Sequence, residues 1–99
     1  MFTVRLTREF ESWLNSLRDE RAQRLIAARL VRLRGGHAGD VRSVGNGVSE
    51  MRIDYGPGYR LYFARRGQAV YVLLQGGDKA SQARDIARAQ AMAAELGPE

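Results

Sequence analysis

Three cations of the chain, Arg52, Arg60 and Lys79, have side chains and positions suited to binding a phosphate. Arg52 and Arg60 lie in segments 48–54 and 59–65, whose alternating residues predict strands. A guanidinium can bind two phosphate oxygens at once. Lys79 is the only lysine and follows a double glycine where a helix is expected to begin, so its charge could act together with free backbone N–H groups. The alternative for Lys79 is a chance surface lysine with no such role.

The polar side chains of these two segments are expected to meet across a hairpin, because residues 56–58 form a Gly-Pro-Gly turn signal. A register that pairs Tyr55 with Tyr59 creates two further pairs, Asp54 with Arg60 and Arg52 with Tyr62. The exposed patch predicted in this way contains Glu50, Arg52, Asp54, Arg60 and Tyr62. The alternative is a set of cross-strand salt bridges that only keeps the sheet soluble.

A second group of arginines is predicted on a helix that runs from about residue 20 to residue 34. At 100° per residue, Arg21, Arg24 and Arg32 lie on one flank of this helix. They could form an electrostatic track for nucleic acid. The alternative is an ordinary solvated helix face.

Composition limits the classes of function. The 99 residues carry a net charge of +5, and 15 of the 16 basic side chains are arginines. This bias favours an anionic partner, either nucleic acid or an acidic protein, although an arginine-rich proteome from a GC-rich genome is the alternative explanation. The absence of cysteine excludes disulfides, zinc–thiolate sites, iron–sulfur clusters and thiol nucleophiles.

Other sites are also disfavoured. The single histidine, His37, cannot build a multi-histidine metal site and is expected in a surface loop. Asp54 could share a metal with Asp78 or Asp85, but the intervening arginines argue against a cation site. No nucleotide cofactor fingerprint is present, so we expect neither a cofactor nor a metal. No apolar run approaches membrane-spanning length and the N-terminus lacks a signal-peptide core, so we expect one cytoplasmic domain over residues 1–99, with no membrane partner.

The elements that must position these residues are predicted from periodicity. A short strand at 2–6 is followed by Thr7, a helix cap, and by a helix with this apolar stripe: Phe10, Trp13, Leu14 and Leu17. The second helix begins near Asp19 and ends at about Arg34. A weak strand at 41–44 and three clearer strands at 48–54, 59–65 and 69–74 come next. A final helix runs from about Lys79 to Leu96, is stopped by Gly97 and Pro98, and has a thin packing face: Ala83, Ile86, Ala87 and Ala94.

This order predicts an α+β fold. We expect a mostly antiparallel sheet, with the N-terminal helical hairpin packed on one face and a C-terminal helix after the last strand.

Four stretches of the chain occur together in a known group of proteins. They are residues 10–14 (Phe-Glu-Ser-Trp-Leu), 47–53 (Gly-Val-Ser-Glu-Met-Arg-Ile), 56–63 (Gly-Pro-Gly-Tyr-Arg-Leu-Tyr-Phe) and 73–79 (Leu-Leu-Gln-Gly-Gly-Asp-Lys). In this order they resemble the RelE/ParE superfamily of toxins, and within it the HigB-like addiction module killer proteins. The resemblance extends from about Phe2 to Ala91. It implies the RelE-like fold, a twisted sheet with a helical hairpin.

The resemblance also implies a function. RelE-like proteins are small basic endoribonucleases that cut mRNA in the ribosomal A site without a metal and so inhibit translation. A cognate antitoxin encoded beside the toxin neutralises it, and in the HigB branch this antitoxin is typically a HigA-like helix-turn-helix protein whose complex with the toxin represses their operon. The ribosome, mRNA and antitoxin are therefore the expected partners, and operator DNA is expected only through the antitoxin complex.

Family site residues carry over in part. Arg52, Arg60 and Lys79 match basic positions of the family, whereas some relatives have a second basic residue where this chain has Asp54. Some relatives also carry a tyrosine or histidine in the last helix, around where this chain has Gln82, Arg84 and Asp85. The resemblance thus implies catalytic roles for Arg52, Arg60, Lys79 and Asp54. The residues expected to contact RNA are Arg21, Arg24, Arg32, Tyr62, Gln82 and Arg84. The general acid and base remain unassigned.

Two other functions are compatible with the sequence. A ParE-like inhibitor of DNA gyrase shares the fold but cuts no RNA, and the grouping of Arg52, Arg60 and Lys79 favours the nuclease. A non-catalytic protein could instead use the basic surface to bind nucleic acid or an acidic antitoxin.

Overall fold

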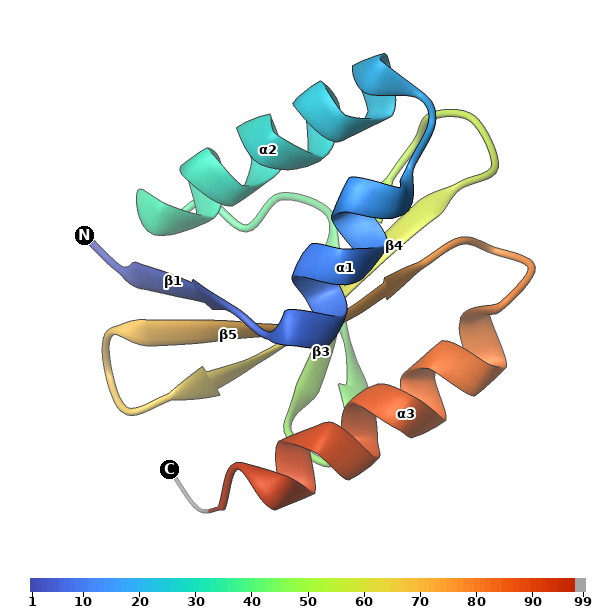
Figure 1. The fold of residues 1–99 in the computed structure, drawn as a ribbon. Helices are drawn as coiled ribbons and strands as arrows, with labels where there is room; N and C mark the ends of the chain where they lie inside the picture. The colour runs from blue at the N-terminus through green and yellow to red at the C-terminus, as the bar shows by residue number, and fades with distance from the viewer. Residues whose placement is uncertain (98–99) are drawn as a thin grey trace.

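A five-stranded mixed sheet forms the centre of the computed structural model, which describes residues 1–97 (Figure 1). The elements in chain order are β1 (Thr3–Leu6), α1 (Arg8–Ser16), α2 (Glu20–Arg34), β2 (Val41–Gly45), β3 (Val48–Ile53), β4 (Tyr59–Arg66), β5 (Val70–Gly77) and α3 (Gln82–Glu95). The strand order is β1-β5-β4-β3-β2, and only β1 and β5 are parallel. The predicted α+β fold with a mostly antiparallel sheet is confirmed. Pro98, which was expected to help end the last helix, lies outside the described residues.

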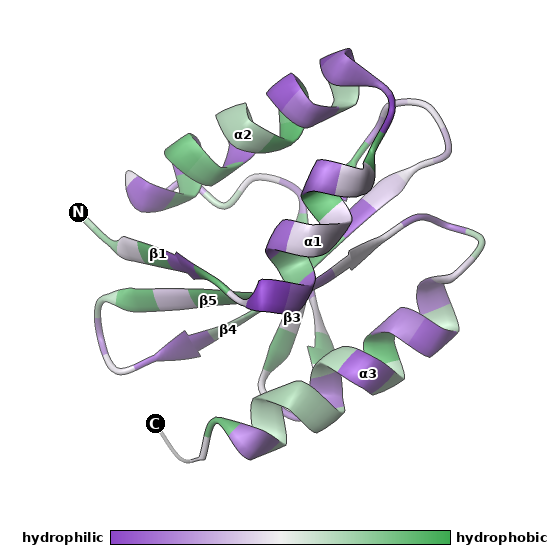
Figure 2. Cartoon of the chain, viewed as in Figure 1, coloured by the Kyte–Doolittle hydropathy of each residue, from purple (hydrophilic) through white to green (hydrophobic). Residues whose placement is uncertain are grey.

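Helices cover both faces of the sheet. The helical hairpin α1–α2 packs on one face, where Phe10 and Ile26 join apolar side chains of the central strands. The helix α3 packs on the other face, where Ala89 and Met92 contact a second apolar cluster that includes Leu74. Figure 2 shows apolar and polar residues alternating around α2, as expected of a helix that buries one side. Within residues 1–97, no helix is both long and apolar enough to cross a membrane.

The starts of the first two helices follow local chemistry. The Thr7 side chain accepts a hydrogen bond from the backbone N–H of Phe10, which confirms Thr7 as the cap of α1. Asp19 caps α2 by accepting from the N–H groups of Arg21 and Ala22. These side chains satisfy N–H groups that have no partner within the first turn of a helix.

The packing face predicted for α3 is confirmed only at Ile86, which packs against the second apolar cluster, and is wrong at its three alanines. Its buried residues are Asp85, Ala89, Met92 and Ala93, whereas Ala83, Ala87 and Ala94 are exposed. Alanines surround this helix on every side, so apolar periodicity does not identify the buried face. The buried face includes Asp85, whose carboxylate lies against the backbone of Gly77, where any side chain would overlap it.

The β3–β4 hairpin is paired two residues away from the predicted register. Ile53 lies opposite Tyr59, so residues 54–58 connect the strands. Two glycines in this connection have positive φ angles, which permit the wider turn. The hydroxyl of Tyr55 donates a 2.7 Å hydrogen bond to Asp19, which holds Tyr55 out of the strand. A two-residue shift leaves each side chain on its predicted face but changes every cross-strand pair.

Candidate active site

A hollow of about 360 Å³ lies beside the β3–β4 turn. Its lining residues are Asp40, Arg52, Ile53, Asp54, Gly58, Arg60 and Lys79. All four residues expected to be catalytic therefore line one hollow. They reach it from β3, the β3–β4 turn, β4 and the segment after β5.

The observed register places two arginines directly across from each other. Arg52 lies opposite Arg60, an arrangement of like charges that destabilises a sheet unless counter-ions are present. Each arginine has one: Asp40 lies 3.0 Å from Arg52, and Glu50 lies 3.7 Å from Arg60. The predicted pair of Asp54 with Arg60 is wrong, because Asp54 lies in the wider turn and is exposed.

The Arg52–Asp40 pair forms the outer wall of the hollow. Arg52 Nη2 donates to Asp40 Oδ1, and the Arg52 backbone N–H donates to the Asp40 carbonyl at 2.9 Å. The hydrogen bond from Arg52 lowers the pKa of Asp40, and the same bond raises the pKa of Arg52. The Arg52 side chain remains 47% exposed. Asp40 thus orients a cation that is still free to meet a ligand.

Arg29 of α2 ties the loop that carries Asp40 to β3. Its Nη1 donates to the Arg52 carbonyl at 2.9 Å and its Nη2 donates to the Ala38 carbonyl at 3.2 Å. A Cβ atom at Gly39 would lie 2.6 Å from the same guanidinium and would displace it, and the φ of 76° at Gly39 also favours glycine. Burial lowers the pKa of Arg29, as expected for a charged group that is taken out of water.

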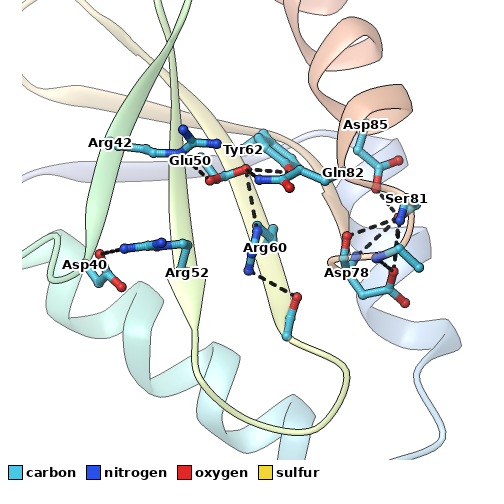
Figure 3. A network of polar contacts seen from close by, with 12 residues as sticks. Asp40, Arg42, Glu50, Arg52, Arg60, Tyr62, Asp78, Ser81, Gln82 and Asp85 are labelled. Atoms are coloured by element: carbon cyan, nitrogen blue, oxygen red, sulfur yellow. Dashed lines mark hydrogen bonds and ion pairs between the residues drawn. The ribbon is translucent and has the colours of Figure 1, made fainter.

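Arg60 is held from its inner side. Its side chain is only 12% exposed, with Nε 3.7 Å from Glu50 Oε2 and Nη1 3.4 Å from the Gly58 carbonyl. Gly58 has a φ of 80°, which favours glycine and lets its carbonyl reach Arg60. Figure 3 shows the Arg60 side chain between Glu50 and this carbonyl.

The predicted exposed patch is partly buried. Glu50 and Tyr62 are both 0% exposed, because the first turn of α3 brings Gln82 over them. The Tyr62 hydroxyl donates a 3.0 Å hydrogen bond to Glu50. The expectation of a surface tyrosine for RNA contact is therefore wrong.

Glu50 is the centre of a polar network (Figure 3). It accepts hydrogen bonds from Arg42 at 2.9 Å, from Gln82 at 2.9 Å and from Tyr62. Burial alone would raise the pKa of Glu50, but these three hydrogen bonds outweigh burial and hold the pKa below its ordinary value. Burial and the neighbouring carboxylate raise the pKa of Tyr62, which keeps its hydroxyl protonated as a donor.

Lys79 lies before the helix instead of at its start. The Asp78 carboxylate accepts hydrogen bonds from the N–H groups of Ala80 and Ser81, so α3 begins only at Gln82. The Lys79 N–H points to the Pro57 carbonyl at 3.4 Å. The predicted set of free N–H groups for a phosphate is therefore wrong. The Lys79 side chain itself is exposed and lines the hollow.

The other residues expected to contact RNA lie outside the hollow. Arg21, Arg24 and Arg32 are exposed on α2, which covers the opposite face of the sheet. Arg84 is 82% exposed and borders a separate hollow of about 510 Å³ next to Trp13. Gln82 is half-buried and donates to Glu50.

Sequence reasoning missed Asp40 and Arg42. A signal for Arg42 exists in Asn46-Gly47, which is typical of a two-residue hairpin and has positive φ at both residues. An unbroken ladder beginning at Gly45 and Val48 would pair Ser43 with Glu50. A bulge between Ser43 and Gly45 moves the register by one residue and brings Arg42 to Glu50 instead.

The site is therefore a cationic hollow with two carboxylates, Asp40 and Asp54, at its surface. Three cations around one hollow can bind a phosphate and stabilise charge that develops on it. Within residues 1–97, no three His, Cys, Asp or Glu side chains gather in a way that could hold a metal ion.

Comparisons with known proteins agree with the expected class. Residues 12–94 match the family described as Phage derived protein Gp49-like (DUF891). An uncharacterised protein of Haemophilus influenzae is 45% identical over 94 residues, which cover 95% of each chain. No solved structure matched this chain. The chain belongs to the Gp49-like family, a family of RelE-like addiction-module toxins.

Proposed function

We propose that the protein is the toxin of a type II toxin–antitoxin system and a ribosome-dependent mRNA endoribonuclease of the HigB-like type that works without a metal. The observation that carries this proposal is the grouping of Arg52, Arg60 and Lys79 around one hollow together with Asp54. The Gp49-like family supports the toxin class. The cations in the hollow support phosphate chemistry.

In the proposed reaction, an RNA 2′-hydroxyl oxygen attacks the adjacent phosphorus and the bond to the 5′-oxygen breaks. The products are a 2′,3′-cyclic phosphate and a 5′-hydroxyl end. Arg60 and Arg52 bind the non-bridging oxygens and neutralise the charge of the pentacoordinate state. Lys79 contacts the phosphate or donates a proton to the leaving 5′-oxygen.

Asp54 is the carboxylate best placed to take the 2′-hydroxyl proton. Glu50 is buried and already accepts three hydrogen bonds, so substrate cannot reach it. The lowered pKa of Asp40 makes it a poorer base. Asp54 is itself an exposed carboxylate and a weak base, which fits an enzyme that relies on the ribosome to hold mRNA in a reactive geometry.

The proposed partners follow from this activity. The ribosome presents the mRNA, and an adjacent HigA-like helix-turn-helix antitoxin covers the cationic surface. Operator DNA is bound only by the toxin–antitoxin complex. The net charge of +5 suits partners that present phosphates or carboxylates.

The test is an mRNA cleavage assay with purified protein, in the presence and absence of ribosomes. We expect cuts inside reading frames only when ribosomes are present, and growth arrest when the protein is expressed without its antitoxin. Arrest with intact mRNA and a defect in DNA supercoiling would favour a gyrase inhibitor. Binding without cleavage or arrest would favour a non-catalytic protein.

A further inference from the structure

A buried carboxylate lies directly behind the cationic hollow. Glu50 is 0% exposed on a strand face whose neighbouring residue, Arg52, reaches solvent. Burial of a charge is costly unless hydrogen bonds and counter-ions compensate for it. The network around Glu50 supplies both hydrogen bonds and counter-ions. Because a charge that only keeps the sheet soluble would not need to be buried, the burial of Glu50 indicates another role.

The two Glu50 oxygens are used differently. Oε1 accepts from Arg42 Nε at 2.9 Å, whereas Oε2 accepts from Tyr62 and from Gln82. The Arg60 Nε atom lies 3.7 Å from Oε2, a distance that permits an ion pair but not a hydrogen bond. Among the described residues, Arg60 Nε has no hydrogen-bond partner. Glu50 is therefore the charge that neutralises the inner edge of Arg60.

We propose that Glu50 is a positioning residue that orients Arg60 toward the phosphate in the hollow. The Gly58 carbonyl accepts from Nη1, while no described residue binds Nη2. With Nε against Glu50 and Nη1 against the turn, the guanidinium plane is fixed from two sides. The Nη2 edge is left for the ligand. An arginine held in this way loses little freedom when phosphate binds.

Glu50 does not act as a base in this proposal. A base must reach the proton that it removes, and Glu50 is covered by Gln82. Three donated hydrogen bonds also hold the pKa of Glu50 below its ordinary value, which keeps it charged near neutrality. A permanent negative charge is what a counter-ion for Arg60 requires.

The first test compares Glu50→Gln with Tyr62→Phe. Glutamine keeps the shape of Glu50 and an oxygen for Tyr62 and Gln82, and half-exposed Arg42 can move away from the new N–H group. Tyr62→Phe removes one hydrogen bond from the same network but leaves the charge that faces Arg60. Both variants should lower Tm.

On the proposed endoribonuclease activity, Glu50→Gln should lower kcat by about 10- to 100-fold with little change in KM, as expected when a catalytic group is misplaced by a small distance. Tyr62→Phe should keep kcat within about threefold of wild type, because the phosphate hollow keeps its charges. In an Arg60→Ala background, Glu50→Gln should have no further effect on kcat. If Glu50→Gln and Tyr62→Phe lower kcat equally, Glu50 has a merely structural role. The same conclusion holds if the effects of Glu50→Gln and Arg60→Ala on kcat add in the double variant.

A second measurement does not depend on cleavage. The Arg60 Nε–H group should exchange with solvent slowly in wild type and in Tyr62→Phe, and faster in Glu50→Gln, with exposed Arg24 as the internal reference. The kcat comparison rests on the proposed function, but this exchange comparison does not. If no variant cleaves mRNA while the exchange pattern holds, the proposed function fails and the positioning role stands. If wild-type Arg60 exchanges as fast as Arg24, the positioning role is overturned.

Discussion

Two groups of three cations occupy opposite faces of the sheet, and their surroundings differ. In the hollow, Arg52 and Arg60 are each paired with a carboxylate. The backbone N–H of Lys79 contacts the Pro57 carbonyl in the β3–β4 turn. On α2, the arginine flank (Arg21, Arg24 and Arg32) forms no ion pair with any described residue.

An arginine can act on an anion in two ways, by preorganised contact or by long-range attraction. An arginine whose direction is fixed can stabilise a transition state, because little reorganisation is needed during the reaction. A solvated arginine can only raise the local concentration of an anion, and this effect weakens with salt. The comparison predicts that substitutions in the hollow change kcat, whereas substitutions on α2 change binding.

Arg60 should show the largest effect. Arg60→Ala removes the most buried cation of the hollow, so we expect the cleavage rate to fall by about 10²–10³-fold, as when one preorganised donor is deleted from an oxyanion site. Arg60→Lys should restore activity only in part, because an ammonium cannot make two parallel contacts. Since Arg60 is 12% exposed and faces Glu50, Tm should also fall. Full toxicity of Arg60→Ala would contradict its assignment to the active site.

Arg52 should show a smaller effect, because it is more exposed. Arg52→Ala should lower kcat/KM by about 10- to 100-fold, through loss of one charge-assisted contact of roughly 1.5–3 kcal/mol. Asp40→Asn is the matched control, since it removes the partner of Arg52 but keeps a side chain of the same shape. Single-turnover cleavage by the two variants measures the difference. A loss in Asp40→Asn as large as that in Arg52→Ala would assign the main role to Asp40.

The hollow should also respond to pH, whereas Arg24 on the α2 flank should not contribute to this response. The folded pKa of Glu50 lies below its ordinary value of 4.5, so ionised Glu50 stabilises the fold above that value. As pH falls from about 4.5 through the lower folded pKa, this contribution is lost and the free energy of unfolding decreases. Glu50→Gln should make the free energy of unfolding less dependent on pH in this range.

Urea unfolding at several pH values between 3 and 7 checks this expectation. Arg24→Gln on the α2 flank is the control, because Arg24 has no ion-pair partner among the described residues. Arg24→Gln should leave the fall in the free energy of unfolding at acid pH unchanged. A Glu50→Gln profile that is parallel to that of wild type would show that Glu50 does not couple folding to acid.

Much of the fold follows from short-range patterns in the sequence. Alternation along 48–54 and 59–65 placed each polar side chain on the face where the structure has it, because a strand has a period of two. Thr7 identified the start of α1 by its capping chemistry, and Asp19 identified the start of α2 by its negative charge at a helix N-terminus. These features depend only on neighbouring residues.

Features that depend on distant parts of the chain were not predicted. The register of β3 and β4 depends on the width of the turn, and Tyr55 reaches Asp19 on another element to hold that turn open. The burial of Glu50 depends on the position of α3, which an alanine-rich sequence does not encode by periodicity. The grouping of Arg52 and Arg60 was nevertheless predicted, because a shift by two residues keeps both side chains on one face.

The arginine flank of α2 should show the smallest effect. Replacing Arg21, Arg24 and Arg32 by glutamine keeps the helix but removes three exposed charges. At roughly 0.2–0.5 kcal/mol per exposed charge, binding to ribosome-associated RNA should weaken by about three- to tenfold, with kcat unchanged. The slope of log affinity against log salt should become shallower, because fewer counterions are released on binding.

A control for net charge distinguishes a track on α2 from general attraction. Replacing Arg5, Arg8 and Arg18 by glutamine removes the same charge from exposed positions outside α2. If α2 lies along the RNA, only the α2 variant should lose affinity at low salt, and the two variants should become alike at high salt as screening removes the contribution of exposed charges. Equal losses at low salt would mean that these arginines act only through the net charge of +5. A fall in kcat for the α2 variant alone would break the division between the two faces, because it would show that charges outside the hollow also act in the chemical step.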